Sequence, residues 1–249
     1  MFEYTPGTIT GEENPYALTE IARTTINRKD LRTLAEVGNG YAQKAVASNE
    51  YAPVDVLAML ATSSNSYVRR AVALNEKSDE AILRLLAEDE NSWVRQAVAA
   101  HPAAPQDVLL LLASDENPFV CRNVAKRPEA DADALHAVAL SGDTYAMYQV
   151  AVNPNTAVET LTLLSDETDR WVLYGLARNS HTPSIIRNST KVKAAVAALK
   201  AMWAEQSKVE TVAPVLEGSL LDALPDDDDD AVSDVTEDFV ESLLSRLAA

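Results

Sequence analysis

Apolar positions recur along this chain with two periods at once. Within short stretches, apolar side chains stand three or four residues apart, which is the spacing of one face of an α-helix. A longer phrase of the same character starts at Tyr41, Tyr67, Trp93, Phe119, Tyr145 and Trp171, so each copy begins 26 residues after the one before. A repeat of this length predicts stacked helical units, because a single unit cannot bury its own apolar face.

Each unit carries signals for two helices. An earlier copy starts at Tyr16, 25 residues before Tyr41. A residue that can cap a helix stands two positions before each of these seven aromatic residues, at Asn14, Asn39, Asn65, Asn91, Asn117, Asp143 and Asp169. The first helix ends near Asn49, Asn75, His101, Arg127, Asn153 and Asn179. Four of these six are asparagine, which tolerates the left-handed backbone that often terminates a helix, and we expect that backbone there. The second helix carries apolar pairs three residues apart, such as Leu83 and Leu86. The sequence therefore predicts an all-α solenoid of about seven helix pairs.

The repeat resembles a known family. The stretch LAEDENSWVRQAVAAHPAAPQDVLLLLASDENPFVCRNVAKRP is similar to the variant leucine-rich repeat and to HEAT-like repeats. The resemblance extends over about residues 14–200 and implies a right-handed superhelix that serves as a scaffold. The founding type of the family carries an iron–sulfur cluster on an N-terminal group of cysteines. This chain has no cysteine before Cys121, so we expect no cofactor.

The periodicity also predicts which side of each first helix is exposed. Apolar rows that include Val98 should face the core, and the opposite side is our candidate partner-binding surface. Its residues are Lys44, Arg70, Gln96, Arg122, Lys126, Tyr148, Tyr174 and Arg178. The two tyrosines stand where earlier repeats have polar residues, although a plain solvated face would explain the cations equally well. We expect Arg69 and Arg95 to pair with carboxylates of the turns, and the aromatic row that begins each repeat to be packing.

The acidity of the chain is concentrated at its C-terminal end. The net charge is −17, and residues 201–249 hold 13 acidic against 2 basic residues. We divide the chain into an N-terminal extension (1–13), a solenoid (14–206), and an acidic linker with a short amphipathic helix (207–249). The apolar face of that last helix offers a contact through Phe239, Leu243, Leu244 and Leu247. It could cap the solenoid, dock into the chain's own groove, or bind a partner.

Signals for catalysis, for a metal site or for a membrane anchor are missing from the sequence. The three histidines lack metal-ligand spacing, and no glycine-rich phosphate loop occurs. The apolar runs are too short to span a bilayer, and the N-terminus does not resemble a secretory signal. A single cysteine fits a reducing environment. We therefore expect a cytoplasmic protein that is not an enzyme and has no metal or cofactor.

These observations favour a non-catalytic scaffold that binds a protein or peptide along its concave face, with the acidic C-terminal segment as a second contact or regulator. The alternative is a nucleic-acid-associated HEAT-like protein, of the DNA-glycosylase type, because some HEAT-like glycosylases use a basic concave groove. A third possibility is an acidic DNA mimic or inhibitor. The overall negative charge disfavours nucleic acid and anionic membranes as partners.

Overall fold

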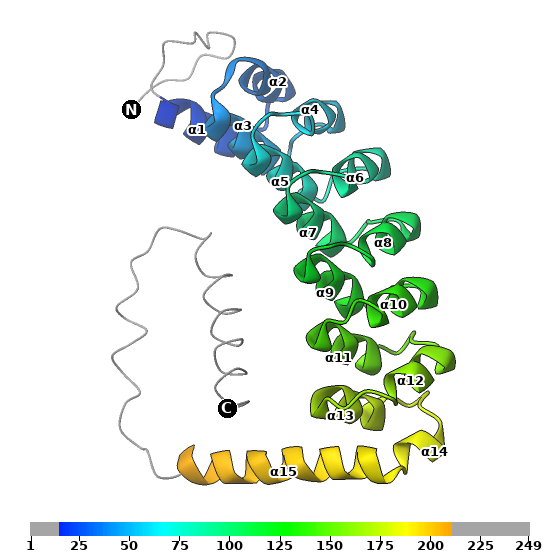
Figure 1. Cartoon of the computed structure of the whole chain (residues 1–249). Coiled ribbons are helices and arrows are strands. Elements are labelled where there is room, and N and C mark those ends of the chain that lie inside the picture. Colours follow the sequence, from blue (N-terminus) through cyan, green and yellow to red (C-terminus); the bar gives the residue numbers. More distant parts are fainter. Residues whose placement is uncertain (1–14, 211–249) are drawn as a thin grey trace. The chain divides into compact units, whose positions relative to one another are not determined.

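The computed structural model describes residues 15–210, with side chains for residues 17–204. This range contains fifteen α-helices and no strand (Figure 1). The chain forms two compact units, Met1–Leu199 and Lys200–Ala249, and the helical stack belongs to the first. The predicted all-α solenoid is confirmed.

Seven helix pairs follow one another within the described residues, as predicted. The first helices are α1 (Pro15–Thr24), α3 (Gly40–Ala47), α5 (Ser66–Leu74), α7 (Ser92–Ala100), α9 (Pro118–Lys126), α11 (Thr144–Val152) and α13 (Arg170–Arg178). The second helices are α2 (Arg28–Val37), α4 (Val54–Leu60), α6 (Glu80–Ala87), α8 (Gln106–Leu112), α10 (Ala132–Ala139), α12 (Val158–Leu164) and α14 (Ser184–Arg187). A longer helix, α15 (Thr190–Glu210), follows the last pair and crosses the domain boundary that we predicted at residue 206.

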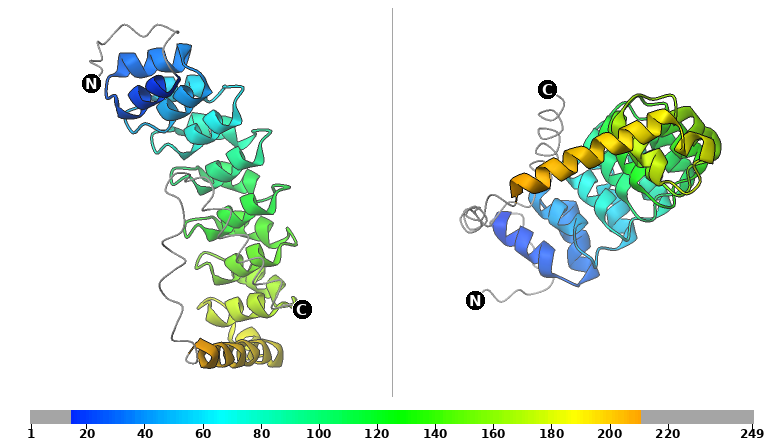
Figure 2. Two further views of the ribbon diagram at one scale, coloured as in Figure 1. Left: turned by 90° about the vertical axis from the view of Figure 1, so that its left-hand side faces the viewer. Right: turned by 90° about the horizontal axis from the view of Figure 1, so that it is seen from below.

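The two kinds of helix form two rows. In the first unit, each first helix from α3 to α11 packs on the first helices of both neighbouring repeats, whereas the second helices approach one another less closely. The odd-numbered first helices from α3 to α13 lie along one side of the stack, and the even-numbered second helices from α4 to α12 lie along the other (Figure 1). The left view of Figure 2 shows the layers following one another in the order of the sequence. Small residues permit the close approach of the first helices: Ala47, Ala73 and Ala99 are completely buried. The first helices therefore form the inner row.

The leucine pairs of the second helices complete the core between the rows. Leu57, Leu83 and Leu109 are completely buried, and their partners three residues later are nearly so. Full burial of such a side chain contributes about 1.5–3 kcal/mol. Because each pair is repeated in the next layer, a continuous apolar core runs through the first unit. At the end of that unit, Val192, Ala195 and Leu199 of α15 are also buried.

The predicted helix caps are present. The side chains of Asn39, Asn65, Asn91, Asn117, Asp143 and Asp169 each accept a hydrogen bond from a backbone N–H of the following helical turn. In α7, for example, Asn91 Oδ1 lies 2.9 Å from the backbone nitrogen of Trp93. The first predicted cap, Asn14, lies outside the described residues. The same position thus begins every described first helix from α3 onward.

The predicted left-handed helix ends are wrong. From α5 onward, the residues that follow the first helices have extended backbone, as at Asn75 (φ −76°, ψ 121°) and Asn153 (φ −69°, ψ 130°). Their side chains are instead buried and join one repeat to the previous one. Asn153 Nδ2 donates to the carbonyl oxygens of Ala125 (3.1 Å) and Arg127 (2.7 Å), and Asn153 Oδ1 accepts from the N–H of Asn155. Asparagine is used here because one amide both donates twice and accepts.

This inter-repeat ladder consists of Asn49, Asn75, His101, Arg127, Asn153 and Asn179. His101 takes the place of an asparagine with the same geometry. Its Nδ1 accepts from the N–H of Ala103, so its Nε2 must carry the proton that reaches the carbonyl of Asn75 at 3.0 Å. Arg127 substitutes by donating to the carbonyls of Ala99, His101 and Pro102. The ladder satisfies carbonyl groups that would otherwise be buried without a partner.

Candidate functional site

Two arginines of the inner row are tied to the next repeat, as predicted. Arg69 Nε lies 2.6 Å from Asp89 Oδ2, and Arg95 Nε lies 2.7 Å from Asp115 Oδ2. Both pairs are almost completely buried and have a second hydrogen bond from Nη2. Burial alone would raise the pKa of Asp89, but hydrogen bonds from Arg69 and from the backbone of Asn91 hold it below its ordinary value. These arginines belong to the scaffold and are not available for a partner.

The arginine–aspartate pairing made by Arg69 and Arg95 shifts by one position in the following repeat. Cys121 replaces the arginine, and its thiol is 3.2 Å from the carbonyl of Asp115, at the place where Arg95 contacts the carbonyl of Asp89. The neighbouring residue Arg122 then pairs with Asp143, with two contacts of 3.0 Å. Its side chain is only 16% exposed. Arg122, a predicted partner-binding residue, is therefore largely committed to the scaffold.

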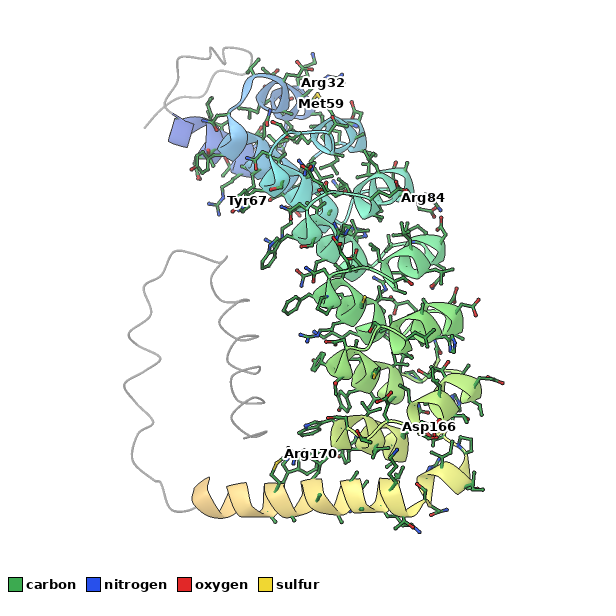
Figure 3. The ribbon with its side chains drawn as sticks, in the orientation of Figure 1. Arg32, Met59, Tyr67, Arg84, Asp166 and Arg170 are labelled. Carbon is green, nitrogen blue, oxygen red and sulfur yellow. The ribbon has the colours of Figure 1, made fainter. Side chains whose placement is uncertain are left out.

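The aromatic row that begins each first helix is not core packing, contrary to our expectation. Tyr41 is 76% exposed, Tyr67 64% and Trp93 48%, and Phe119, Tyr145 and Trp171 are half-buried. In Figure 3, Tyr67 projects from α5 to the side opposite Arg84 of the second-helix row. We call these six residues the ring row. They form a candidate contact surface that the sequence analysis missed.

The signal for this exposure was present in the sequence. In an α-helix, residues three and seven positions apart lie on the same face. The residues three positions after the ring row are Lys44, Arg70, Gln96, Arg122, Tyr148 and Tyr174, which we had placed on the exposed side. Lys126 and Arg178 stand seven positions after Phe119 and Trp171. The ring row and these eight predicted residues form one stripe on the first helices, the inner stripe.

Cations of the inner stripe lie over its rings. The guanidinium of Arg70 is 5.8 Å from the ring centroid of Trp93 in the next repeat. Arg122 lies between two rings, 4.8 Å from Phe119 and 5.2 Å from Tyr145, and the ammonium of Lys126 is 5.6 Å from Tyr145. Such contacts hold the long basic side chains against the surface, which reduces the entropy they lose when a partner binds.

Four rings from α11 and α13 are in contact with one another. The ring centroids follow as Tyr145 to Tyr148 at 6.5 Å, Tyr148 to Trp171 at 6.3 Å and Trp171 to Tyr174 at 6.5 Å. Gly175 permits this approach, because a Cβ there would lie 2.8 Å from the Cβ of Ala151 and 3.4 Å from Tyr148. Arg178 donates to the hydroxyl of Tyr174 at 3.0 Å. Tyr148 and Tyr174, the two tyrosines at positions that are polar in earlier repeats, both lie in this four-ring cluster.

Charge is sorted between the two rows of helices. The six first helices α3, α5, α7, α9, α11 and α13 contain no aspartate or glutamate. The second helices opposite them carry Asp55, Glu80, Asp107, Asp133 and Glu159 in their first turns. In a chain with 38 acidic and 21 basic residues, the inner stripe is thus free of carboxylates. The predicted tail residues Phe239, Leu243, Leu244 and Leu247 lie outside the described residues.

The described residues show little that could support chemistry. They contain no group of three or more His, Cys, Asp or Glu side chains arranged to hold a metal ion. Cys121 is buried, and burial raises the pKa of its thiol, so the reactive thiolate is disfavoured. A shallow depression of about 460 Å³ lies at the turns around Asp131, Asn155 and His181, away from the inner stripe. In the described part of the chain, every helix is too short or too polar to cross a bilayer.

Comparisons with known proteins agree with this fold. The model of the leucine rich repeat variant family matches residues 93–117, which is one repeat. A solved structure described as a leucine-rich repeat variant with a novel repetitive protein structural motif superimposes with a TM-score of 0.51 at 21% sequence identity. The match covers 78% of this chain and 90% of that one. No curated protein matches the chain. The resemblance to the variant leucine-rich repeat is therefore confirmed, both by a repeat that matches the family and by a shared fold.

Proposed function

We propose that this chain is a non-catalytic repeat scaffold whose inner stripe binds an acidic segment of a protein partner. One observation carries the proposal. Six successive first helices hold no carboxylate and present an aromatic ring each, although the chain as a whole is strongly acidic. A solvated face without a function has no need of a ring that is exposed or half-buried at every repeat.

The residue types of the inner stripe support binding rather than mere solubility. Arginine, tyrosine and tryptophan are the residues most often found at the energetic centres of protein interfaces. Here they are interleaved, with Arg70 over Trp93 and Lys126 over Tyr145. An aromatic ring with a cation at its face offers an apolar contact and a charge to the same ligand residue. An acidic segment that also contains apolar residues meets both requirements.

The surrounding charges favour one orientation of the partner. Carboxylates in the second helices and in the turns, such as Asp107 and Glu116, are exposed. They repel an acidic partner from the outer row, so the inner stripe is the surface on which it can settle. Complementary charge of this kind speeds association and suppresses wrong partners. Its effect on affinity should weaken as salt is added.

The acidic C-terminal segment is the second element of the proposal. Residues 211–249 hold 11 acidic residues and one basic residue, and they lie outside the described part of the chain. We propose that this segment is a second contact or a regulator of partner binding. Its charge has the sign of the ligand that we propose, so its removal should strengthen binding of an acidic peptide at low salt.

The test compares two charge reversals of equal size. Arg70→Glu changes the inner stripe, and Arg84→Glu changes the outer row, where Arg84 pairs with Glu80 and Asp107. Binding of a fluorescent acidic peptide to the full chain should weaken at least tenfold in Arg70→Glu and less than twofold in Arg84→Glu. Equal losses, or no binding by the unmodified chain, would refute the inner stripe as the site.

Single-stranded nucleic acid is the second candidate, because rings interleaved with arginine also stack on bases. Its binding to the full chain should be measured across salt concentration. A steep decline in the binding constant with salt, together with sensitivity to Arg70→Glu, would support phosphate contacts. Absence of binding would leave the protein partner.

A further inference from the structure

The inner stripe repeats, and this constrains the shape of its ligand. We infer that the bound segment is an extended polyproline II peptide, which places a proline or other apolar residue on the ring of each repeat and an acidic residue beside the neighbouring cation. This inference rests on the proposed function and adds the conformation and the sequence period of the ligand.

The argument begins with spacing. Neighbouring first helices are in direct contact along the stack, and helices packed in this way have axes about 8–10 Å apart. The ring row has one ring per repeat, so successive rings share this spacing. A polyproline II helix has three residues per turn and rises about 3.1 Å per residue, so its side chains return to the same face about every 9 Å. One turn of the peptide therefore matches one repeat of the protein.

Other peptide conformations fit this spacing less well. A β-strand presents the same face every second residue, about 6.6 Å apart, and falls out of step after one repeat. An α-helix returns to the same face about every 3.6 residues, or about 5.4 Å along its axis, so only every second turn would meet a ring. At about 10–12 Å in diameter it is also wide for a stripe only one ring and one cation across. A period of three residues is the one that brings a peptide side chain to the ring of every repeat and leaves other side chains for the cations beside the rings.

The four-ring cluster supports the same ligand independently of the spacing. Aromatic-lined grooves are the usual receptor for proline-rich segments, because the polyproline II conformation is preformed and costs little entropy to bind. Tyr145, Tyr148, Trp171 and Tyr174 form such a surface through three successive ring contacts of 6.3–6.5 Å. Half-buried rings that support one another keep their orientation, so the surface is prepared before the peptide arrives.

The position of the cations gives the ligand its second feature. Lys126 lies 5.6 Å from the ring of Tyr145, and Arg178 lies 5.6 Å from the ring of Tyr174. A peptide whose proline rests on one of these rings brings its next side chains within reach of the cation. An aspartate or glutamate at one of the two remaining positions of such a triplet would pair with it. The ligand is therefore a run of triplets that contain proline and an acidic residue.

The experiment uses the full chain and three fluorescent peptides of twelve residues with equal charge. The first contains four Pro-Pro-Asp triplets. The second has the same composition with the aspartates at irregular positions, and the third is a helix-forming peptide of alanine and glutamate. We expect the triplet peptide to bind at least tenfold more tightly than either of the others.

A pair of matched variants locates the contact. Tyr67 of the ring row and Tyr51 outside it are both exposed tyrosines, at 64% and 48%, so neither substitution should disturb the fold. Tyr67→Ala should weaken binding of the triplet peptide at least threefold, and Tyr51→Ala should leave it unchanged.

The outcomes separate this inference from the function on which it rests. If all three peptides bind equally and Arg70→Glu still weakens them, the inner stripe binds acidic peptides without regard to conformation, and the inference is overturned. If the helical peptide binds best, the inference is also overturned. If none of the peptides binds, both the inference and the proposed function fall.

Discussion

The ring of Tyr148 in α11 meets the ring of Trp171 in α13 edge to face, with centroids 6.3 Å apart and planes at 75°. This contact joins two repeats on the surface that we assign to the partner, so one residue serves both the stack and the site. The two roles can be separated, because the ring is only half-buried.

Tyr148→Ala should weaken peptide binding about tenfold while lowering the free energy of unfolding by only about 1–2 kcal/mol. The loss of stability comes from one edge-to-face contact and partial burial. Tyr148→Phe retains the ring and should bind nearly as well as the unmodified chain. Binding is measured by fluorescence anisotropy and stability by urea titration. If Tyr148→Ala costs more than 4 kcal/mol, the residue belongs to the core and not to the site.

The two faces of α7 can be tested with the same substitution at neighbouring positions. Val98 is completely buried, so Val98→Asp places an unpaired charge in the core and should unfold at least the central repeats. Gln96 is half-buried on the inner stripe. Gln96→Asp should retain normal circular dichroism and thermal unfolding but weaken binding of an acidic peptide. Normal folding of Val98→Asp would overturn the assignment of the faces.

The shift from Arg95 to Cys121 and Arg122 in the arginine–aspartate pairing can be tested with a double-mutant cycle. Asp115→Ser leaves the nearly buried guanidinium of Arg95 without its main carboxylate and should cost up to about 3 kcal/mol. Adding Arg95→Cys reproduces the pair that the next repeat has in Cys121 and Ser141, where Ser141 Oγ accepts from the N–H of Asp143. The double variant should therefore recover at least half of the loss in urea titration. If the stability lost by the double variant equals the sum of the losses of Asp115→Ser and Arg95→Cys alone, the cysteine and the serine do not compensate each other.

His101 should make the stability of the stack depend on pH. Burial lowers the pKa of His101, and the charge of Arg127 lowers it further. The unfolded chain, with an imidazole pKa of about 6.5, therefore binds a proton more tightly than the folded chain. The free energy of unfolding is highest when the imidazole is neutral in both states, and it falls as the pH drops below about 6.5.

His101→Asn should remove this dependence, because asparagine makes the same ladder bonds and does not titrate. The measurement is urea unfolding of both proteins at pH 7.5 and pH 5.5. The unmodified chain should lose more stability between these values than the variant does. Parallel losses in the two proteins would show that another group is responsible.

The sequence predicted the backbone of this protein well because the repeat multiplies weak signals. A single capping asparagine is a modest indication, but the same residue at the same place in Asn65, Asn91 and Asn117 fixes where helices begin. The buried rows and the pairing of Arg69 and Arg95 followed from the same register. Local hydrogen bonds and helical periodicity are properties of short segments, so they can be recognised without knowing the neighbours.

What the sequence did not reveal depends on contacts between repeats. The asparagines that end the first helices looked like left-handed caps, because a backbone turn and an inter-repeat hydrogen bond use the same residue type. The sequence also predicts packing for the ring row, because aromatic residues at regular intervals usually pack inside, and this prediction is wrong. The burial of both groups depends on how closely one layer lies on the next. The sequence of a single repeat does not contain that distance. The chain's own pattern determined the helices and their order, while the stacking decided that asparagines point inward and rings outward.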